Sequence, residues 1–356
     1  MFGANSYGAT PIQLAIESGC QKTIEVLLNS YDNKVFKNVH NESQQTLAHL
    51  VSLAGQTHVA EYLVKHSVNW NVQDIDGNTP LHLACNKNNT DIVKLIAGHC
   101  TVTIQNKDLK TPIHIAVLSG KVVILDALLE GYSGSLDEFA DLDGNTALHS
   151  ACQSNNDSSC YIVKRLCDYC SLTVENKEKS TPMHFACKFG NFALVDHLFK
   201  RYSSLHLDCL LVDDDENTIL HVAVENSASL EVVTVVSNHI SPVHKNKQGE
   251  TSIHIACRNG DLPIVRLLVT KAAELVFTDS DDSYLHSACC GKSLKVVMFL
   301  VEESGLAFDR LMNTNNDGNT PLHCAFITGI FEIISYLMRY ANLYTQNLNK
   351  EGLTPY

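Results

Sequence analysis

A six-residue segment that usually begins with Thr, carries His at its fourth position and ends with Ala recurs along the whole chain. Three clear copies begin at Thr79, Thr111 and Thr320 and read Thr-Pro-Leu-His-Leu-Ala, Thr-Pro-Ile-His-Ile-Ala and Thr-Pro-Leu-His-Cys-Ala. Successive copies begin 32 to 37 residues apart, which gives ten repeats and the start of an eleventh. The first residues of the copies, here called anchors, are Thr10, Thr46, Thr79, Thr111, Thr146, Thr181, Thr218, Thr251, Ser283, Thr320 and Thr354. A fixed period of this length predicts stacked small units instead of one globular core.

Each copy has the features of a helix start. Thr caps a helix, Pro fits the first helical position, and apolar residues then begin a buried face. In eight of the ten repeats an apolar or near-apolar pair follows thirteen residues after the anchor and predicts a second helix, as at Ile92-Val93 and Ile264-Val265. The tetrapeptide Asp-Gly-Asn-Thr at residues 76–79, 143–146 and 317–320 predicts a hairpin-like turn before the first helix.

This motif and its period resemble those of the ankyrin repeat family. The resemblance implies an all-α solenoid of stacked helix-turn-helix units with short β-hairpin-like connecting loops, and we expect one array over residues 1–356. The truncated repeat from Thr354 and the abrupt start predict a piece of a longer protein. Extra residues at 133–135, 203–210 and 305–312 predict irregular loops or lengthened helix ends.

Composition limits the classes of partner. The formal net charge of −13 argues against general affinity for nucleic acid or anionic lipid, because both bind clustered Lys and Arg. No apolar run approaches the roughly 18 residues that a membrane span needs. Thirteen cysteines without a recognisable export signal fit the reducing cytoplasm, with the nucleus as an alternative. Protein partners are therefore expected, and the oligomeric state is left open.

Histidine and cysteine are abundant, but their positions repeat with the motif. Nine histidines occupy the position three residues after an anchor, and five cysteines directly follow the motif Ala. We therefore interpret the histidines as structural and the cysteines as buried free thiols. Cys167 and Cys170 form a CxxC with Cys160 nearby, but a second pair of ligands at suitable spacing is absent, so a zinc or redox site is disfavoured.

No catalytic chemistry is expected in these residues. The sequence contains no phosphate-binding GxxxxGK[ST], no GxSxG and no HExxH. We predict no enzyme activity, no cofactor and no metal.

The family resemblance also implies where a partner lies: against the concave side that hairpin turns and first helices form. The corresponding positions are four and one before an anchor, and seven and eight after it. Basic residues at these positions suggest a broken basic stripe, which Asp214 and Glu225 interrupt. Apolar residues would supply much of the affinity. The predicted contact residues are Lys107, Lys110, Leu118, Leu142, Lys177, Lys188, Phe189, Asp214, Glu225, Lys247 and Arg258.

Three functions fit this sequence. A protein-interaction scaffold is favoured, and it would bind a macromolecular partner on the concave face. The second is the regulatory ankyrin region of a larger signalling enzyme, such as a kinase or ubiquitin ligase. The third is the cytoplasmic array of a membrane channel, which would require apolar segments of about 20 residues elsewhere in the protein.

Overall fold

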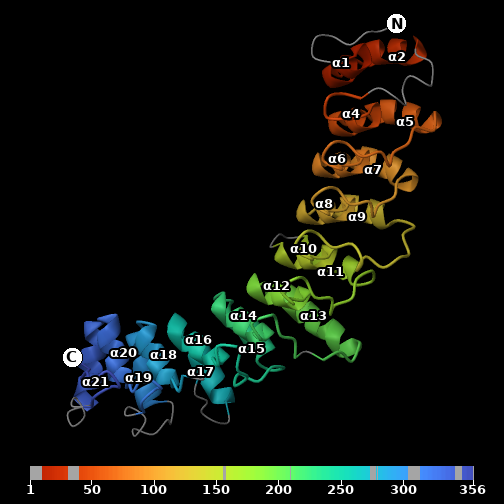
Figure 1. The fold of residues 1–356 in the computed structure, drawn as a ribbon. Coiled ribbons are helices and arrows are strands. Elements are labelled where there is room, and N and C mark those ends of the chain that lie inside the picture. The colour runs from red at the N-terminus through yellow and green to blue at the C-terminus, as the bar shows by residue number, and fades with distance from the viewer. Residues whose placement is uncertain are drawn as a thin grey trace. The chain divides into compact units, whose positions relative to one another are not determined.

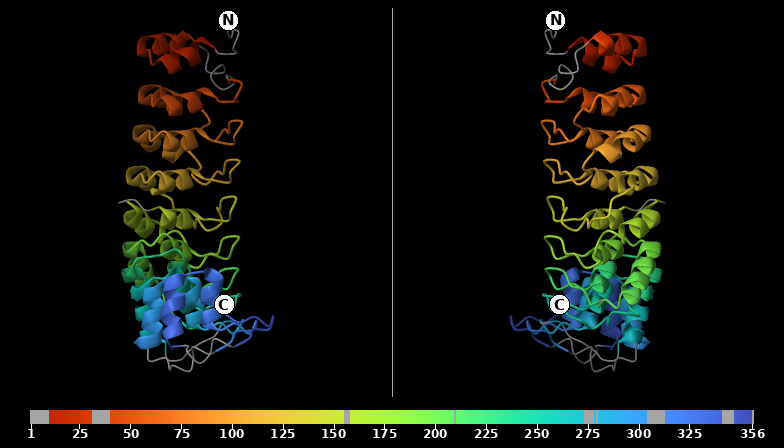
Figure 2. Two further views of the ribbon diagram at one scale, coloured as in Figure 1. Left: turned by 90° about the vertical axis from the view of Figure 1, so that its left-hand side faces the viewer. Right: turned by 90° about the vertical axis from the view of Figure 1, so that its right-hand side faces the viewer.

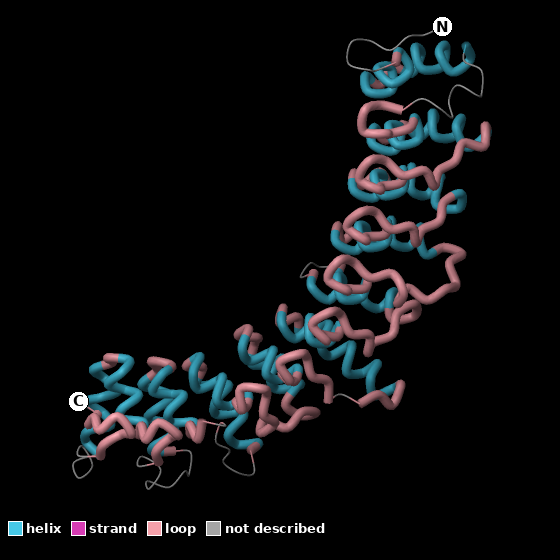
Figure 3. Tube along the Cα trace, in the orientation of Figure 1, coloured by secondary structure: helices cyan, strands magenta, loops and turns pink. Residues whose placement is uncertain are grey.

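The computed structural model describes residues 10–30, 40–154, 158–208, 210–272, 278, 280–303, 313–340 and 347–355. Residues 305–312, for which the sequence predicts an irregular loop or a lengthened helix end, lie outside the described residues. The chain divides into two compact units, Met1–Lys177 and Glu178–Tyr356, and each is described by itself. The described residues contain helices and no strand beyond two isolated bridges, His40–Thr46 and Val212–Thr218. The expected all-α fold is therefore confirmed (Figure 3).

In the first unit, the helices form two rows (Figure 1). The first helix of each repeat packs on the first helix of the next, as α4, α6 and α8 do, and the second helices α5, α7 and α9 pack in the same way. The helices are α1 (Pro11–Ser18), α2 (Gln21–Ser30), α4 (Leu47–Ala54), α5 (Thr57–Lys65), α6 (Pro80–Asn86), α7 (Thr90–Ile96), η1 (Ala97–His99), α8 (Pro112–Leu118), α9 (Val122–Leu129), α10 (Ala147–Gln153) and α11 (Ser159–Leu166).

The second unit repeats this arrangement. Its first helices α12, α14, α16, α18 and α20 pack on one another in chain order, and each also packs on the second helix of its own repeat. The helices are α12 (Pro182–Lys188), α13 (Phe192–Ser204), α14 (Ile219–Glu225), α15 (Leu230–Val236), α16 (Ser252–Asn259), α17 (Leu262–Lys271), α18 (Tyr284–Cys290), α19 (Leu294–Glu302), α20 (Pro321–Thr328) and α21 (Phe331–Tyr340). The 13-residue α13 confirms a lengthened helix end at Ser203 and Ser204.

Every anchor from the first to the tenth repeat is the N-cap of a first helix, as predicted. In the third repeat, the backbone N–H of Thr79 donates to Nδ1 of His82 at 3.0 Å, and the backbone N–H of His82 donates to the Thr79 hydroxyl at 3.4 Å. Both ends of the capping interaction are therefore satisfied within the first turn. The first repeat uses Gln13, whose Oε1 accepts the N–H of Thr10 at 2.7 Å.

The same histidines also connect neighbouring repeats. Nε2 of His82 contacts the carbonyl oxygen of Lys110, one residue before the next anchor, at 3.0 Å. Because Nδ1 already accepts a hydrogen bond from a backbone N–H, the proton of the neutral ring must lie on Nε2, which donates. We call this pair of interactions the histidine bridge. It is also formed by His49, His114, His221, His254, His286 and His323.

The core lies between the two rows of helices within each unit. The predicted second-helix pairs Ile92-Val93 and Ile264-Val265 are buried, whereas in the tenth repeat Ile333 is buried and Ile334 is half-buried. The cysteines that follow the motif Ala, such as Cys85, are also fully buried, which confirms their interpretation as core residues. Removal of this apolar surface from water is the main source of stability in such a stack.

A tight turn, here called a tip, precedes most first helices, and the tips project to one side of the stacked pairs (Figure 2). In the third repeat, the backbone N–H of Asp74 donates to the carbonyl of Asn78 at 2.9 Å, and the Asp74 carboxylate accepts two backbone N–H groups. Gly77 has a φ of 77°, and a Cβ there would lie 2.9 Å from the backbone nitrogen of Lys107. Gly is therefore required both by the turn and by the close approach of the next tip.

We predict that acid weakens the fold through the histidine bridges. Burial lowers the pKa of His82 and His221 to about 4, and that of His254 to about 3, from an ordinary 6.5. Below pH 6.5 the unfolded chain therefore binds more protons than the folded chain, and the free energy of unfolding falls until the folded histidines protonate. At pH 5 each of the three should cost about 2 kcal/mol, measurable by urea unfolding followed by circular dichroism from pH 7.5 to 4.5.

The matched control is the triple variant His82→Gln, His221→Gln and His254→Gln, because the first repeat carries Gln at this position. The amide preserves the cap and cannot titrate. The variant should be less stable at pH 7.5 but should lose less stability on acidification. An equally steep loss in the variant and the parent would show that other groups cause the acid sensitivity.

We predict that damage to the core stays local. Leu81 on α6 is fully buried, so Leu81→Ala should lower the free energy of unfolding by about 2–5 kcal/mol. Hydrogen exchange should accelerate first in α6 and in the helices α4 and α8 that pack against it. Leu118→Ala, at a side chain that is 44% exposed, is the control and should change stability by roughly 0.5 kcal/mol or less. If hydrogen exchange accelerated equally throughout both units, the stability of a repeat would not depend mainly on its own core and its neighbours.

Candidate functional site

The candidate binding surface is formed by the tips and by the last residues of the first helices. We call it the inner surface and define it by the positions four and one before each anchor and seven and eight after it. Several neighbouring tips are hydrogen-bonded to each other. In the first unit, the backbone N–H of Lys107 donates to the carbonyl of Asp76 at 3.0 Å, and the Asn106 amide donates to the Asn78 side chain at 2.9 Å. The backbone from which the exposed side chains project is therefore held in place.

A groove of about 440 Å³ lies on the inner surface between the third and fourth repeats. It brings together three of the predicted contact residues: Lys107 and Lys110 from the tip, and Leu118 from the end of α8. We call it the tip groove. Its lining residues are Asp76, Asn78, Asn86, Asn106, Lys107, Asp108, Lys110, Ile115, Leu118 and Ser119.

The tip groove combines three kinds of contact. Leu118 offers an apolar side chain that is 44% exposed, and Asn86 offers an amide at the end of α6. Within the part of the chain that the structure describes, neither Lys107 nor Lys110 forms an ion pair, so both ammonium groups can meet an acidic ligand. An apolar contact beside charged and amide groups is typical of a surface that binds another protein.

Other predicted contacts of the first unit lie on the next two tips. Leu142 belongs to the fifth repeat, and its side chain is 51% exposed. Its carbonyl oxygen accepts a hydrogen bond from Nζ of Lys177 at 2.6 Å. The ammonium group of Lys177 therefore stabilises the tip as well as presenting charge, a role that the sequence did not indicate.

In the second unit, several of the predicted contact residues have charged or polar partners within the chain. Asp214 forms an ion pair with Lys179 at 3.3 Å, its carbonyl accepts a hydrogen bond from Nζ of Lys247, and Arg258 pairs with Glu250. These charges are thus partly neutralised within the chain. The sequence pattern missed these pairings because their partners lie on a neighbouring tip or on the following helix, and spacing alone does not show which side chains meet.

The remaining predicted contacts lie at the ends of first helices. Lys188 ends α12 and Phe189 caps it, while Glu225 ends α14, and all three are exposed. The ring of Phe189 lies 6.4 Å from that of Phe185, centroid to centroid, in a tilted arrangement. This contact holds the Phe189 ring in place on the inner surface, where it could form an apolar anchor.

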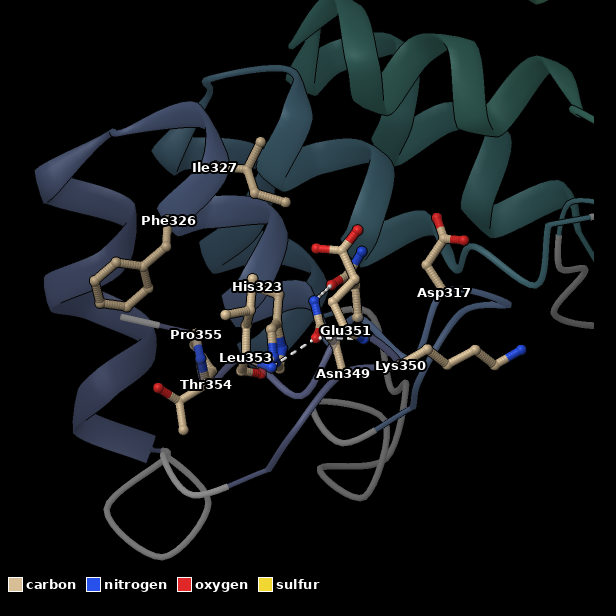
Figure 4. Close-up of a pocket in the computed structure, with 11 residues that line it drawn as sticks. Asp317, His323, Phe326, Ile327, Asn349, Lys350, Glu351, Leu353, Thr354 and Pro355 are labelled. Atoms are coloured by element: carbon tan, nitrogen blue, oxygen red, sulfur yellow. Dashed lines mark hydrogen bonds between the residues drawn. The ribbon is translucent and has the colours of Figure 1, made fainter.

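A second groove, of about 520 Å³, lies between the tenth repeat and the start of the eleventh (Figure 4). Phe326 and Ile327 on α20 lie above the tip residues Lys350 and Leu353, and Ile327 is 75% exposed. Ile327 follows its anchor by seven residues, as Asn86 does in the tip groove. Our set of contact residues omitted this groove because it covered only the third to eighth repeats, although the same positions would have indicated it.

The thiols and imidazoles do not form a metal site in the described part of the chain. No three His, Cys, Asp or Glu side chains converge there as a set of ligands. Cys167 and Cys170 of the CxxC are both buried, and burial raises the pKa of Cys170 above its ordinary value. A buried protonated thiol is a poor nucleophile and a poor metal ligand. These cysteines therefore serve packing.

Two helices per repeat, stacked in two rows with the tips beside them, define a helical repeat protein. A family model described as ankyrin repeats (3 copies) matches at residues 30–108, 95–173, 113–207, 157–245, 204–279, 220–312 and 272–347. The chain belongs to the ankyrin repeat family. Within the described residues, no helix is both long enough and apolar enough to cross a membrane.

Several characterised proteins are similar to this chain. The B-cell lymphoma 3 protein homolog of Mus musculus is 31% identical over 212 residues, which are 56% of this chain and 45% of that protein. The human transient receptor potential cation channel subfamily A member 1 is 26% identical over 297 residues, 80% of this chain and 23% of the channel. Rabankyrin-5 of Mus musculus is 27% identical over 156 residues, 43% of this chain and 13% of that protein. The chain covers less than half the length of each of these relatives.

We predict that removal of divalent metal leaves the fold unchanged, because the histidines are used in bridges and the motif cysteines in the core. Thermal unfolding with and without a strong chelator should give superimposable curves. A large decrease in melting temperature, together with stoichiometric zinc by elemental analysis, would instead indicate a metal site, and Cys160, Cys167 and Cys170 would be tested first.

Proposed function

We propose that this chain is a non-catalytic protein-interaction scaffold that binds a macromolecular partner on its inner surface, with the ten repeats acting as one array. The tip groove carries this proposal, because it joins two lysines that form no ion pair in the described structure to an exposed leucine on a rigid frame. Rigid presentation lowers the entropy cost of binding. Membership of the ankyrin repeat family supports protein binding in general, and the cytoplasm or nucleus is the proposed location.

The chemistry of the tip groove favours an extended protein segment with an acidic side chain and a nearby apolar side chain. Lys107 and Lys110 would attract the carboxylate, and Leu118 would pack against the apolar group. Asp76 and Asp108 on the same lining disfavour a continuous polyanion such as nucleic acid. The net charge of −13 also disfavours a nucleic acid as the partner.

The comparison with the human cation channel favours a second function. The similarity to the cation channel extends over 80% of this chain, more than the other relatives described above. The chain would then be the ankyrin array of a larger membrane channel, and the inner surface would contact another part of that protein. The regulatory region of a larger signalling enzyme is a further alternative, which the sequence of any following segment would distinguish.

The proposal is tested by reversing the charge of the tip groove. Lys107→Glu combined with Lys110→Glu should weaken partner binding by about tenfold or more and reduce its salt dependence. The melting temperature should change little, because both side chains are at least partly exposed and form no ion pair. Partners are captured on the immobilised parent chain, identified by mass spectrometry and measured by titration calorimetry.

The matched control reverses two lysines of the same repeats that lie away from the inner surface. Lys94 on α7 and Lys121 before α9 are both exposed, so Lys94→Glu combined with Lys121→Glu makes an equal charge change. The partner should bind this variant as tightly as it binds the parent. If the groove variant also bound as tightly as the parent at low salt, the tip groove would not be the binding site.

A further inference from the structure

Two cysteines from neighbouring repeats meet on the inner surface of the second unit. Cys290 is the last residue of α18, and Cys324 lies in the first turn of α20. These two first helices pack against each other, and the thiols of Cys290 and Cys324 lie close enough to interact. Cys290 is exposed, whereas Cys324 is 7% exposed. One thiol is thus open to solvent while its partner is sheltered beside it.

The register of the repeats explains why these two side chains meet. Cys290 lies seven residues after its anchor, and Cys324 lies four residues after the next anchor. The equivalent residues of the third and fourth repeats, Asn86 and Ile115, line the same tip groove. The stacking of successive repeats therefore brings these two positions close together. Only the ninth and tenth repeats place cysteine at both.

The backbone beside Cys290 is tightly held. Gly291 caps α18, and a Cβ at this position would collide with the carbonyl oxygen of Arg258 at the end of α16. The backbone at the end of α18 is thus held close to α16. Its surroundings are the Cys324 thiol, the positive charge of Arg258 and the negative charge of Asp282.

These surroundings favour the thiolate form of Cys290. The hydrogen bond from Cys324 lowers the pKa of Cys290 to about 7 from an ordinary value of 9, and the charge of Arg258 acts in the same direction. Burial and the charge of Asp282 oppose this shift. The same contact raises the pKa of Cys324, which keeps its proton and acts as the donor. A thiolate beside a thiol is the arrangement that oxidation to a disulfide requires.

We propose that Cys290 and Cys324 are a reversible dithiol–disulfide pair that a small hydroperoxide, such as hydrogen peroxide, oxidises. The Cys290 thiolate attacks one oxygen of the peroxide and the O–O bond breaks, which leaves a sulfenic acid and, after proton uptake, one water. The Cys324 thiol then attacks the Cys290 sulfur, its proton leaves with the hydroxyl group as a second water, and the S–S bond forms. The two sulfurs lose two electrons and the peroxide gains them. A dithiol reductant reverses the reaction by exchange.

The disulfide would join the ninth and tenth repeats through their first helices. It would also remove one exposed thiolate from the inner surface. The five cysteines that follow the motif Ala take no part, because they are buried in the core, and burial raises the pKa of Cys257 and Cys289. Oxidation of the pair requires no bound partner, so its test is separate from that of the proposed function.

The first measurement uses the parent chain. Alkylation with iodoacetamide, followed residue by residue with mass spectrometry, should modify Cys290 about tenfold or more faster than Cys289, with a half-maximal rate near pH 7. After treatment with one equivalent of hydrogen peroxide, a non-reducing digest should contain a peptide that links Cys290 to Cys324. Dithiothreitol should remove this link.

Three variants complete the test. Cys324→Ser should retain the fast alkylation of Cys290 and accumulate a sulfenic acid that dimedone traps, without a linked peptide. Cys290→Ser should form no link, and its Cys324 should stay unmodified. Cys20→Ser changes another exposed cysteine, in the first unit, and should leave the link unchanged. Hydrogen exchange of α18 and α20 should slow in the oxidised parent and not in either cysteine variant of the pair.

Three results would overturn the proposal. They are oxidation of Cys290 to sulfinic acid in the parent without a linked peptide, a link from Cys290 to a different cysteine or to a second chain, and slow alkylation of Cys290 at pH 8. The alkylation and digestion of the parent require no substitution, so these outcomes remain decisive even if a variant folds poorly.

Discussion

The histidine bridge is the interaction on which the stack depends. One ring nitrogen of His82 accepts a hydrogen bond from the start of its own helix, and the other donates to the carbonyl of Lys110 before the next helix. The first bond is buried and the second is partly buried, so the loss of either partner would leave a sheltered polar group without compensation. Each bridge therefore couples the formation of one repeat to the position of the next. Burial of the ring lowers its pKa and keeps it neutral, although the hydrogen bond to Lys110 acts in the opposite direction.

The bridge also helps to hold the backbone of the inner surface in place. It fixes the residue before each anchor, while amide contacts such as that of Asn106 with Asn78 fix the rest of the tip. The backbone of the inner surface is thus held without help from the side chains that point outward. Exposed positions such as Leu118 and Ile327 can then vary from repeat to repeat at little cost in stability, as in other rigid frameworks that carry binding residues.

Charge on this surface is only partly available to a partner. Lys107 and Lys110 form no ion pair among the described residues, but Arg258 pairs with Glu250 and Asp214 pairs with Lys179. Exposed pairs of this kind contribute little to stability because water and salt screen them. Their effect is on recognition, since a partner must displace or accommodate them. If the tip groove binds a partner as proposed, its apolar and amide groups would have a larger part in selecting that partner than the net charge suggests.

The sequence determined the repeat, its two helices and its capping residues, because these depend on spacing along the chain and on local chemistry at Thr79, His82 and their equivalents. It also determined which positions lie on the inner surface, since the anchor fixes the register of each helix. Tertiary structure decided which side chains meet there. The hydrogen bond of Lys177 with the tip of Leu142 and the contact of Cys290 with Cys324 join different repeats. Such contacts depend on how far one repeat is rotated and displaced from the next, a quantity set by packing of the whole interface and not by spacing along the chain.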